Sequence, residues 1–350
     1  MAIIDNPELY FQTKLYTGNS GTNAITFDGS ENMQPDWVWL KRRDSGSNNH
    51  RLCDSVRGVN KQIYSSANSA QGTSSGVVQS FDSNGFTLNT SDSSVNVGSY
   101  VCWNWKAGTS VSGTSTGSGT GKAYSGSVNT TSGFSIIKYL GNGSSGHTIP
   151  HHLSAVPQFI VVKSLDRGTN WITYQAPLGA GKFLRLNQTN AESTSSSRWN
   201  DTTPTSTVFT VGNDGDLNNN DEDYIAYIIA NVQGYSKVGS YTGNGNADGT
   251  FVYTGFKPAF VFVKRTNDTE NWTIMDNTRD PFNVAGNKLH PNTSGGTDAG
   301  ATIDILSNGF KNRTTNAGAN GSGDSYIYMA IAENPFVTST GNGSIPATAR

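Results

Sequence analysis

Pro35-Asp-Trp-Val-Trp-Leu-Lys41 is a motif that the chain carries three times, the other copies being Pro157-Gln-Phe-Ile-Val-Val-Lys163 and Pro258-Ala-Phe-Val-Phe-Val-Lys264. In each copy a proline precedes and a lysine follows apolar residues of the β-branched and aromatic kinds that strands favour. A run that is apolar at nearly every position predicts a strand buried on both faces, with an opposing sheet on one side and a neighbouring layer on the other. The proline suits the first residue of a strand, because no ladder donor is needed there.

Other short phrases recur in the same order around this motif. One precedes it: Tyr16-Thr-Gly-Asn19, Tyr139-Leu-Gly-Asn142 and Tyr241-Thr-Gly-Asn244. Another follows it: Tyr100-Val-Cys-Trp-Asn-Trp105, Tyr224-Ile-Ala-Tyr-Ile-Ile229 and Tyr326-Ile-Tyr-Met-Ala-Ile331. The recurrence indicates one small fold duplicated in tandem, and about 100 residues are enough to bury a modest core. We therefore expect a residue shared by all copies to build the fold, and a residue found in one copy to be a candidate for a special function.

Each copy is expected to be a β module, because short runs rich in Val, Ile, Tyr, Phe and Trp alternate with Asn-Gly, Gly-Asn and Ser-Gly turn signals. The fold prediction is all-β: three tandem antiparallel β-sandwich modules of jelly-roll type with short terminal arms, a short barrel being the alternative for each module. The predicted boundaries are an N-terminal arm (1–10), module 1 (11–106), a Gly/Ser/Thr linker (107–131), module 2 (132–233), module 3 (234–336) and a C-terminal tail (337–350).

The linker between modules 1 and 2 has no apolar periodicity, and its composition is typical of a flexible tether. No such spacer separates modules 2 and 3, because Gln233-Gly234 runs almost directly into the next strand. The sequence therefore predicts that modules 2 and 3 move as one body while module 1 swings more freely.

The amino-acid composition limits the classes of partner that the protein can be expected to bind. Only 14% of the 350 residues are charged and the net charge is −2. No basic stripe indicates nucleic acid, and no long apolar run indicates insertion into a membrane. The start of the chain lacks the features of a secretory signal. Cys53 and Cys102 are expected to be buried free thiols, the alternative being a bridge between them.

Asp54-Ser-Val-Arg57 of module 1 aligns with Asp276-Asn-Thr-Arg279 of module 3, whereas module 2 has Gln175-Ala-Pro-Leu178 there. One interpretation is a structural ion pair that locks a loop or a module junction. The other is an Asp–Arg fork presented to a sugar or to a carboxylate of a partner. The structural interpretation is preferred, because an acid held by arginine is a poor proton shuttle.

An acidic run in module 2 is a candidate metal site. Asp214, Asp216, Asn218 and Asn220 place oxygen side chains at alternate positions, as hard cations such as Ca²⁺ require. Asn219 stands where a calcium loop needs glycine, and no glutamate closes the run. A solvated turn before the last strand of module 2 is therefore the competing interpretation. No cofactor other than this calcium ion is expected.

Tryptophans are candidates for sugar stacking, because sugar rings present apolar faces that aromatic rings can cover. The candidate glycan-binding residues are Trp199, Trp171 and Trp272. The alternative is that large rings fill small sandwich cores, which is the interpretation preferred for the tryptophans on the repeated strands. His147, His151 and His152 lie close together, but no carboxylate or thiolate completes a metal-ligand pattern, so a polar loop is preferred.

Enzyme signatures are missing from the chain. There is no nucleophile elbow, no phosphate-binding loop and no dinucleotide fingerprint. A glycosidase needs two carboxylates in one cleft, and the spacing of Asp82, Asp276 and Asp280 gives no reason to pair them. We therefore expect no catalytic residues and a protein that is not an enzyme.

The repeated phrases, together with Asp-Ser-Val-Arg-Gly58, Ser-Asn-Gly-Phe86 and the closing Ile-Ala-Glu-Asn-Pro-Phe336, resemble a family of repetitive virion surface proteins, tail-fibre-like or lectin-like, from tailed phages of marine bacteria. The resemblance implies a virion protein made in the host cytoplasm. Its expected partners are other virion proteins of the head or tail and a host surface polysaccharide, and a homo-oligomer, such as a trimer, is its expected form. The chain departs from a long fibre because it lacks a coiled coil or shaft.

The expected function is thus a non-enzymatic structural protein on a phage particle, in the capsid decoration or the tail, that contacts host glycans. One rival is a capsid cement or knob protein that recognises nothing outside the particle. The other is a polysaccharide depolymerase. The two terminal segments have no counterparts inside the repeats, so they are expected to clip the protein to its virion partner.

Overall fold

The structure is a computed structural model that describes residues 3–338. It is built almost entirely from antiparallel strands arranged in several sheets, so the all-β sandwich prediction is confirmed. The helices are single turns: η1 (Pro7–Leu9), α1 (Ser196–Trp199) and α2 (Gly215–Asn218). None of the helices in residues 3–338 has the length and apolar character that a membrane span requires.

Module 1 is a pair of sheets with a small satellite. Its larger sheet has the order β1-β9-β3-β4 and its smaller sheet the order β2-β8-β7. The strands are β1 (Phe11–Thr17), β2 (Thr22–Thr26), β3 (Trp37–Arg42), β4 (Arg51–Asp54), β5 (Lys61–Gln62), β6 (Gly72–Thr73), β7 (Ser80–Asp82), β8 (Gly85–Asn89) and β9 (Ser99–Trp105).

Module 2 repeats this strand order inside a longer sheet, β13-β20-β15-β16, which is extended at both ends. The facing sheet is β11-β14-β19. The strands of this part of the chain are β10 (Thr109–Thr114), β11 (Thr116–Gly117), β12 (Ala123–Asn129), β13 (Phe134–Leu140), β14 (His147–Pro150), β15 (Pro157–Ser164), β16 (Ile172–Gln175), β17 (Lys182–Arg185), β18 (Ser193–Thr194), β19 (Val208–Val211) and β20 (Asp223–Ala230).

Module 3 has the sheets β21-β28-β23-β24 and β22-β27-β26-β25. In each module the last strand lies between the first strand and the strand of the Pro-to-Lys motif. The strands are β21 (Ser236–Thr242), β22 (Phe251–Tyr253), β23 (Phe256–Arg265), β24 (Thr273–Asp276), β25 (Ala285–Lys288), β26 (Asp298–Leu306), β27 (Gly309–Asn312) and β28 (Ser325–Pro335).

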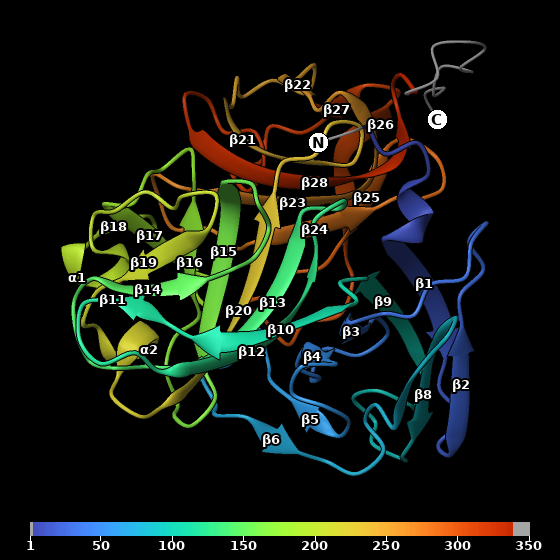
Figure 1. Ribbon diagram of the computed structural model, residues 1–350. Helices are drawn as coiled ribbons and strands as arrows, with labels where there is room; N and C mark the ends of the chain where they lie inside the picture. The colour runs from blue at the N-terminus through green and yellow to red at the C-terminus, as the bar shows by residue number, and fades with distance from the viewer. Residues whose placement is uncertain (1–2, 339–350) are drawn as a thin grey trace.

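The motif strands β3, β15 and β23 are buried on both faces, as their sequence predicts. One face of each strand packs into the sandwich core of its own module, through Val38, Leu40, Ile160, Val162, Val261 and Val263. The alternate side chains belong to a separate core that all three modules share: Trp37, Trp39, Phe159, Val161, Phe260 and Phe262. The neighbouring layer predicted from the sequence is therefore formed by the other modules. Figure 1 shows the blue, green-to-yellow and orange-to-red parts of the chain meeting around this centre.

Backbone hydrogen bonds join the modules in a closed ring. In each module a backbone amide that follows β4, β16 or β24 donates to a backbone carbonyl of another module. That carbonyl lies two residues after the motif lysine. The three bonds are Gln71 to Leu165 (2.8 Å), Glu192 to Thr266 (2.8 Å) and Thr297 to Arg43 (3.0 Å). Module 1 therefore contacts both of its neighbours, and the prediction that it swings freely is wrong. The shared core explains this result, because separating module 1 would expose the tryptophans of its motif strand.

The predicted flexible linker, residues 107–131, is also wrong. It forms β10, β11 and β12, and β12 pairs along β13 at the edge of the large sheet of module 2. An unpaired sheet edge offers a row of backbone donors and acceptors, which a Gly/Ser/Thr segment can satisfy without apolar side chains. Most side chains of β10 are exposed, which explains the missing apolar periodicity.

The segments outside the modules are partly described. In the N-terminal arm, Ile4 is buried in the shared core and its amide donates to the Gln233 carbonyl at 3.4 Å. The tail beyond residue 338 lies outside the described residues. Cys53 and Cys102 are buried free thiols, as preferred from the sequence.

Candidate functional site

Asn218, predicted as a calcium ligand, has a structural role. Its side-chain amide donates to the carbonyls of Gly212 (2.7 Å) and Ser144 (2.9 Å), and its oxygen accepts from the amide of Asn142 at 2.8 Å. The same arrangement occurs in the other modules, where Asn96 accepts from the Asn19 amide (3.2 Å) and Asn320 from the Asn244 amide (3.0 Å). A side chain that appears in every module and is saturated by backbone groups is part of the architecture.

The rest of the acidic run in module 2 is neutralised by cations of the protein. Asp214 and Asp216 both pair with Arg198, and Glu222 pairs with Arg167. Asn220 turns to its neighbour Asp221. The structure thus does not bring the four predicted calcium ligands together, and residues 3–338 contain no group of three or more His, Cys, Asp or Glu suited to a metal. Each acid instead has a local partner, which corrects the calcium interpretation.

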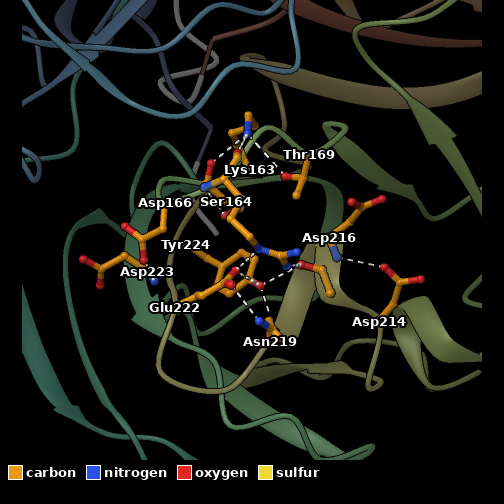
Figure 2. A network of polar contacts seen from close by, with 12 residues as sticks. Lys163, Ser164, Asp166, Thr169, Asp214, Asp216, Asn219, Glu222, Asp223 and Tyr224 are labelled. Carbon is orange, nitrogen blue, oxygen red and sulfur yellow. Dashed lines mark hydrogen bonds and ion pairs between the residues drawn. The ribbon is translucent and has the colours of Figure 1, made fainter.

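Figure 2 shows the polar contacts that this loop makes. Arg167 donates to Glu222 (2.6 Å) and to the Gly215 carbonyl (2.7 Å), where the Tyr224 hydroxyl also donates, at 2.8 Å. Beside it the Lys163 ammonium donates to the carbonyls of Ser164 and Arg167 at 2.8 and 2.9 Å. Burial lowers the pKa of Lys163 to about 8. The network ties the loop after β15 to the start of β20.

The three candidate glycan-binding tryptophans are buried, which corrects that prediction. Trp171 and Trp272 are 0% exposed and Trp199 is 1% exposed. Trp171 donates its indole proton to the Tyr64 carbonyl of module 1 at 2.8 Å, and Trp272 donates to the Arg185 carbonyl of module 2 at 2.9 Å. Both rings therefore close module junctions. Trp199 lies in the sandwich core of module 2 against Tyr174 and Phe209.

The Asp–Arg pairs are structural ion pairs at module junctions, as preferred from the sequence. Asp54 binds the Arg57 guanidinium at 2.5 Å and accepts the hydroxyl of Tyr227, from module 2, at 2.7 Å. Asp276 binds Arg279 at 2.6 Å and accepts the indole N–H of Trp103, from module 1, at 3.0 Å. Both carboxylates are 0% exposed. Each pair thus receives a donor from the adjacent module.

The third junction explains why module 2 lacks the pair. Trp103, Tyr227 and Met329 occupy equivalent positions, because each pairs with the residue four positions after the motif proline. Met329 has no proton to donate, and Gln175 stands where the other modules have aspartate. A buried carboxylate without a donor would be costlier than a neutral amide. Gln175 donates to Thr173 of its own module at 2.6 Å, and its buried oxygen has no hydrogen-bond partner.

The remaining acids considered for catalysis hold local structure. Asp82 accepts the hydroxyls of Ser80 and Thr87, both at 2.7 Å. Asp280 accepts the amides of Gly286 (3.0 Å) and Asn287 (2.8 Å). Asp82 belongs to a separate hydrogen-bonded set, whereas Asp276 and Asp280 are linked through Arg279 and Asn287. Asp276 is closed off from solvent.

An open polar cavity of about 430 Å³ in module 3 is the strongest candidate for a binding site. Its walls come from the start of β24, from β25 and β26, and from the loop before β28. Among its lining residues are Glu270, Thr273, Lys288, His290, Asp298 and Asn316. Its mixed hydrogen-bonding side chains can bind a hydroxylated ligand. We refer to it as the module 3 cavity.

One wall of the module 3 cavity is an ion-pair cluster. Asp298 lies 3.2 Å from the Lys288 ammonium and 3.2 Å from Nε2 of His290. Burial raises the pKa of Asp298, but hydrogen bonds from His290 and Lys288 outweigh it, so the net pKa lies below its usual value. Nδ1 of His290 is 2.8 Å from the Trp272 carbonyl, which also fixes the ring to the module junction.

Sequence reasoning missed this cavity. His290 stood alone in the sequence, and Glu270, Lys288 and Asp298 formed no spaced motif. The one signal in the sequence was that these residues lie between the repeated phrases and are therefore not shared by the modules. At the position of His290, modules 1 and 2 carry Tyr64 and Arg185, which pack against other side chains of their own module.

Comparison with known proteins gives one match. A family model described as a domain of unknown function (DUF7483) covers residues 6–335, which include all three modules. No curated protein and no solved structure matches the chain.

Proposed function

The chain belongs to the family of domains of unknown function termed DUF7483, and on that premise we propose that it is a non-enzymatic protein of a tailed-phage surface that binds host glycans through the module 3 cavity. The observation that carries the glycan part is the cavity itself. It is open and polar, and the side chains that line it lie outside the repeated phrases, whereas the shared residues are used for architecture.

The virion part of the proposal is supported by the repeated phrases that resemble virion surface proteins of tailed phages. The closed ring and its four hydrophobic cores suit a protein that must persist outside a cell without disulfides. We propose further that the chain binds a head or tail protein of the particle and assembles as a homo-oligomer, such as a trimer. Several copies would then convert weak single contacts into useful avidity.

A purely structural cement or knob role is the second candidate, and one observation favours it. Most of the exposed large apolar side chains within residues 3–338 lie in module 3 or directly after it: Phe251, Tyr253, Phe282, Val284 and Val337. Exposed apolar side chains on one part of a molecule suit contact with another protein. In this role module 3 would grip the shell, and the cavity would bind nothing.

The depolymerase alternative has less support. Asp298 is held ionised by its two partners, so it lacks the raised pKa that a general acid needs near neutral pH. Incubation of the protein with host polysaccharide, followed by detection of new reducing ends, tests this alternative. Sugar release that is lost on Glu270→Gln would overturn the non-enzymatic proposal.

The glycan proposal is tested by binding to host surface polysaccharides and to a glycan array. Ala299 is exposed and lines the cavity, so Ala299→Trp should block it without disturbing a core. Ala24→Trp is the matched control, because Ala24 is an exposed strand residue of module 1. We expect binding that survives in A24W and falls at least about tenfold in A299W. Equal binding by both variants, or no binding by the parent protein, would favour the cement role.

The virion proposal is tested on purified particles. Antibody against the recombinant chain should label the head or the tail in electron micrographs, and peptides of the chain should copurify with infectious particles through a density gradient. Absence of the chain from particles that are complete in their other proteins would remove the virion proposal, whatever the glycan result.

A further inference from the structure

We propose that the module 3 cavity selects sugar units that donate hydrogen bonds or carry an amine, and that it rejects acidic sugars. This inference rests on the proposed function, because it names the ligand class of the same cavity. It follows from which polar atoms of the lining are already used and which are left for a ligand.

The cationic side chains of the lining are engaged by one acid. Lys288 and His290 both lie against Oδ2 of Asp298. The Trp272 carbonyl can only accept a proton, so Nδ1 of His290 must donate to it. In a neutral ring Nε2 is then without a proton, and in a charged ring its proton is directed at Asp298. Neither state leaves His290 with a free donor for an anionic ligand.

Glu270 is the lining acid that lacks an ion-pair partner within the described residues. Its Oε1 accepts the amide of Asn271 at 2.9 Å. The cation that interacts with it electrostatically is Lys264, which is buried and donates to the carbonyls of Thr189 (3.2 Å) and Arg265 (2.6 Å). The carboxylate of Glu270 therefore keeps acceptor capacity on the side of the cavity.

The charges of the residues that line the cavity also disfavour an acidic ligand. Glu270 and Asp298 are negative, Lys288 is positive, and His290 adds a charge only when it is protonated. With a charged histidine the two acids and two cations balance, and with a neutral histidine the lining has a surplus of one negative charge, so neither state gives a surplus of positive charge. A uronate, sialate or phosphate group would have to share Lys288 and His290 with Asp298 and would lie beside the Glu270 carboxylate, which is unfavourable in a partly desolvated site. Vicinal hydroxyls or an ammonium group would instead donate to Glu270.

The test is calorimetric titration of the full chain near neutral pH with three oligosaccharides of similar length: glucosamine oligomers, neutral glucose oligomers and galacturonate oligomers. We expect the first two to bind at least about tenfold more tightly than the acidic one, because a hydrogen bond to a charged group contributes about that factor. Glu270→Gln should weaken the binding of glucosamine oligomers at least about tenfold, and Lys288→Met, which frees Asp298, should widen the preference.

Asp28→Asn is the matched control, because Asp28 is an exposed acid of module 1 that pairs with Lys14. Thermal unfolding of each variant shows whether it is folded. Galacturonate that binds as tightly as glucosamine, or affinities unchanged in Glu270→Gln, would overturn the inference. If either result is found but Ala299→Trp still abolishes the binding, the cavity remains a glycan site and only the proposed ligand class is wrong. If none of the three oligosaccharides binds, both the inference and the glycan proposal fail.

Discussion

Two of the three modules place a buried aspartate at a junction, whereas module 2 has the neutral Gln175 at the equivalent position. At the junctions that contain Asp54 and Asp276, the adjacent module supplies a hydroxyl or an indole N–H. Module 2 has Gln175 at the equivalent position, and module 3 carries Met329 where the other modules carry the donor. The Gln175 amide donates to Thr173 of its own module at 2.6 Å, and its oxygen accepts no hydrogen bond. Aspartate thus occurs where another module carries a donor, Tyr227 or Trp103, and glutamine occurs where the equivalent residue is Met329.

This difference shows that repeated folds do not require identical junctions. A buried aspartate is stable when its arginine and an additional donor satisfy its oxygens. Without that donor an uncharged side chain is less costly to bury, even though the backbone fold of the module is the same. The break in the Asp–Arg pattern of module 2 thus coincides with the loss of the donor at the equivalent position of module 3.

The largest expected effect comes from removing one of the acids. Asp276→Ala leaves the buried Arg279 without its counterion and the Trp103 indole without its acceptor. We expect a loss of about 3–5 kcal/mol in the free energy of unfolding, measured by denaturant titration. Gln175→Ala is the matched control at the equivalent position of module 2 and should cost less than about 2 kcal/mol. Equal losses in the two variants would show that the junctions do not differ as described.

A smaller effect is expected from removing the donor alone. Tyr227→Phe deletes the hydroxyl that reaches Asp54 and keeps the ring that stacks on Trp37. The expected cost is about 1.5–3 kcal/mol, because the lost hydrogen bond ends on a charged group. At the equivalent position Met329→Leu should cost less than about 1.5 kcal/mol. A Tyr227→Phe protein as stable as the parent would mean that the hydroxyl does not support Asp54.

The same contrast between shared and unshared residues can be tested inside one loop. Asn218 occupies a position that all modules fill with asparagine, and Asn220 does not. Asn218→Ala should lower the free energy of unfolding by about 1–3 kcal/mol, because it leaves buried backbone groups without partners. Asn220→Ala should change it by less than about 0.5 kcal/mol. If millimolar Ca²⁺ raised the unfolding temperature of the parent but of neither variant, this structural interpretation would be wrong.

The last expected effect is a pH dependence and concerns the three motif lysines. Burial lowers the pKa of Lys41, Lys163 and Lys264 to about 8. In an unfolded chain a lysine titrates near 10.4, so between about pH 8 and pH 10 the unfolded chain holds more protons than the folded one. Stability should therefore rise with pH across this window. Above pH 10 buried tyrosines reverse the trend, because burial raises the pKa of Tyr139 and its equivalents.

Thermal unfolding from pH 7.5 to pH 9.5 checks this prediction, with Lys163→Met as the variant in which the rise becomes shallower. Lys163 donates within its own module, whereas Lys41 reaches the Ser294 carbonyl of module 3 and Lys264 the Thr189 carbonyl of module 2. Replacing either of these two should also weaken a junction and lower the unfolding temperature at every pH. An unfolding temperature that falls steadily across the window would contradict the lowered pKa values.

The local elements of this protein could be predicted from the amino-acid sequence alone. The continuous apolar run Trp37-Val-Trp-Leu40 and its relatives was enough to predict strands buried on two faces, because successive side chains of a strand point to opposite faces. The Asp54–Arg57 and Asp276–Arg279 pairs were also predictable, since their members are three residues apart. The recurrence of Asn96, Asn218 and Asn320 before the last strand would have excluded Asn218 as a metal ligand.

Only the tertiary structure decided what the modules do to one another. No local pattern states that Trp103 meets Asp276, that Trp171 and Trp272 are buried in junctions, or that residues 107–131 find an open sheet edge to pair with. The tryptophan contacts depend on closure of the ring, which brings together residues as far apart in the chain as Arg185 and Trp272, 87 positions, or Trp103 and Asp276, 173 positions. The module 3 cavity has the same origin, because separate strands and loops supply its walls.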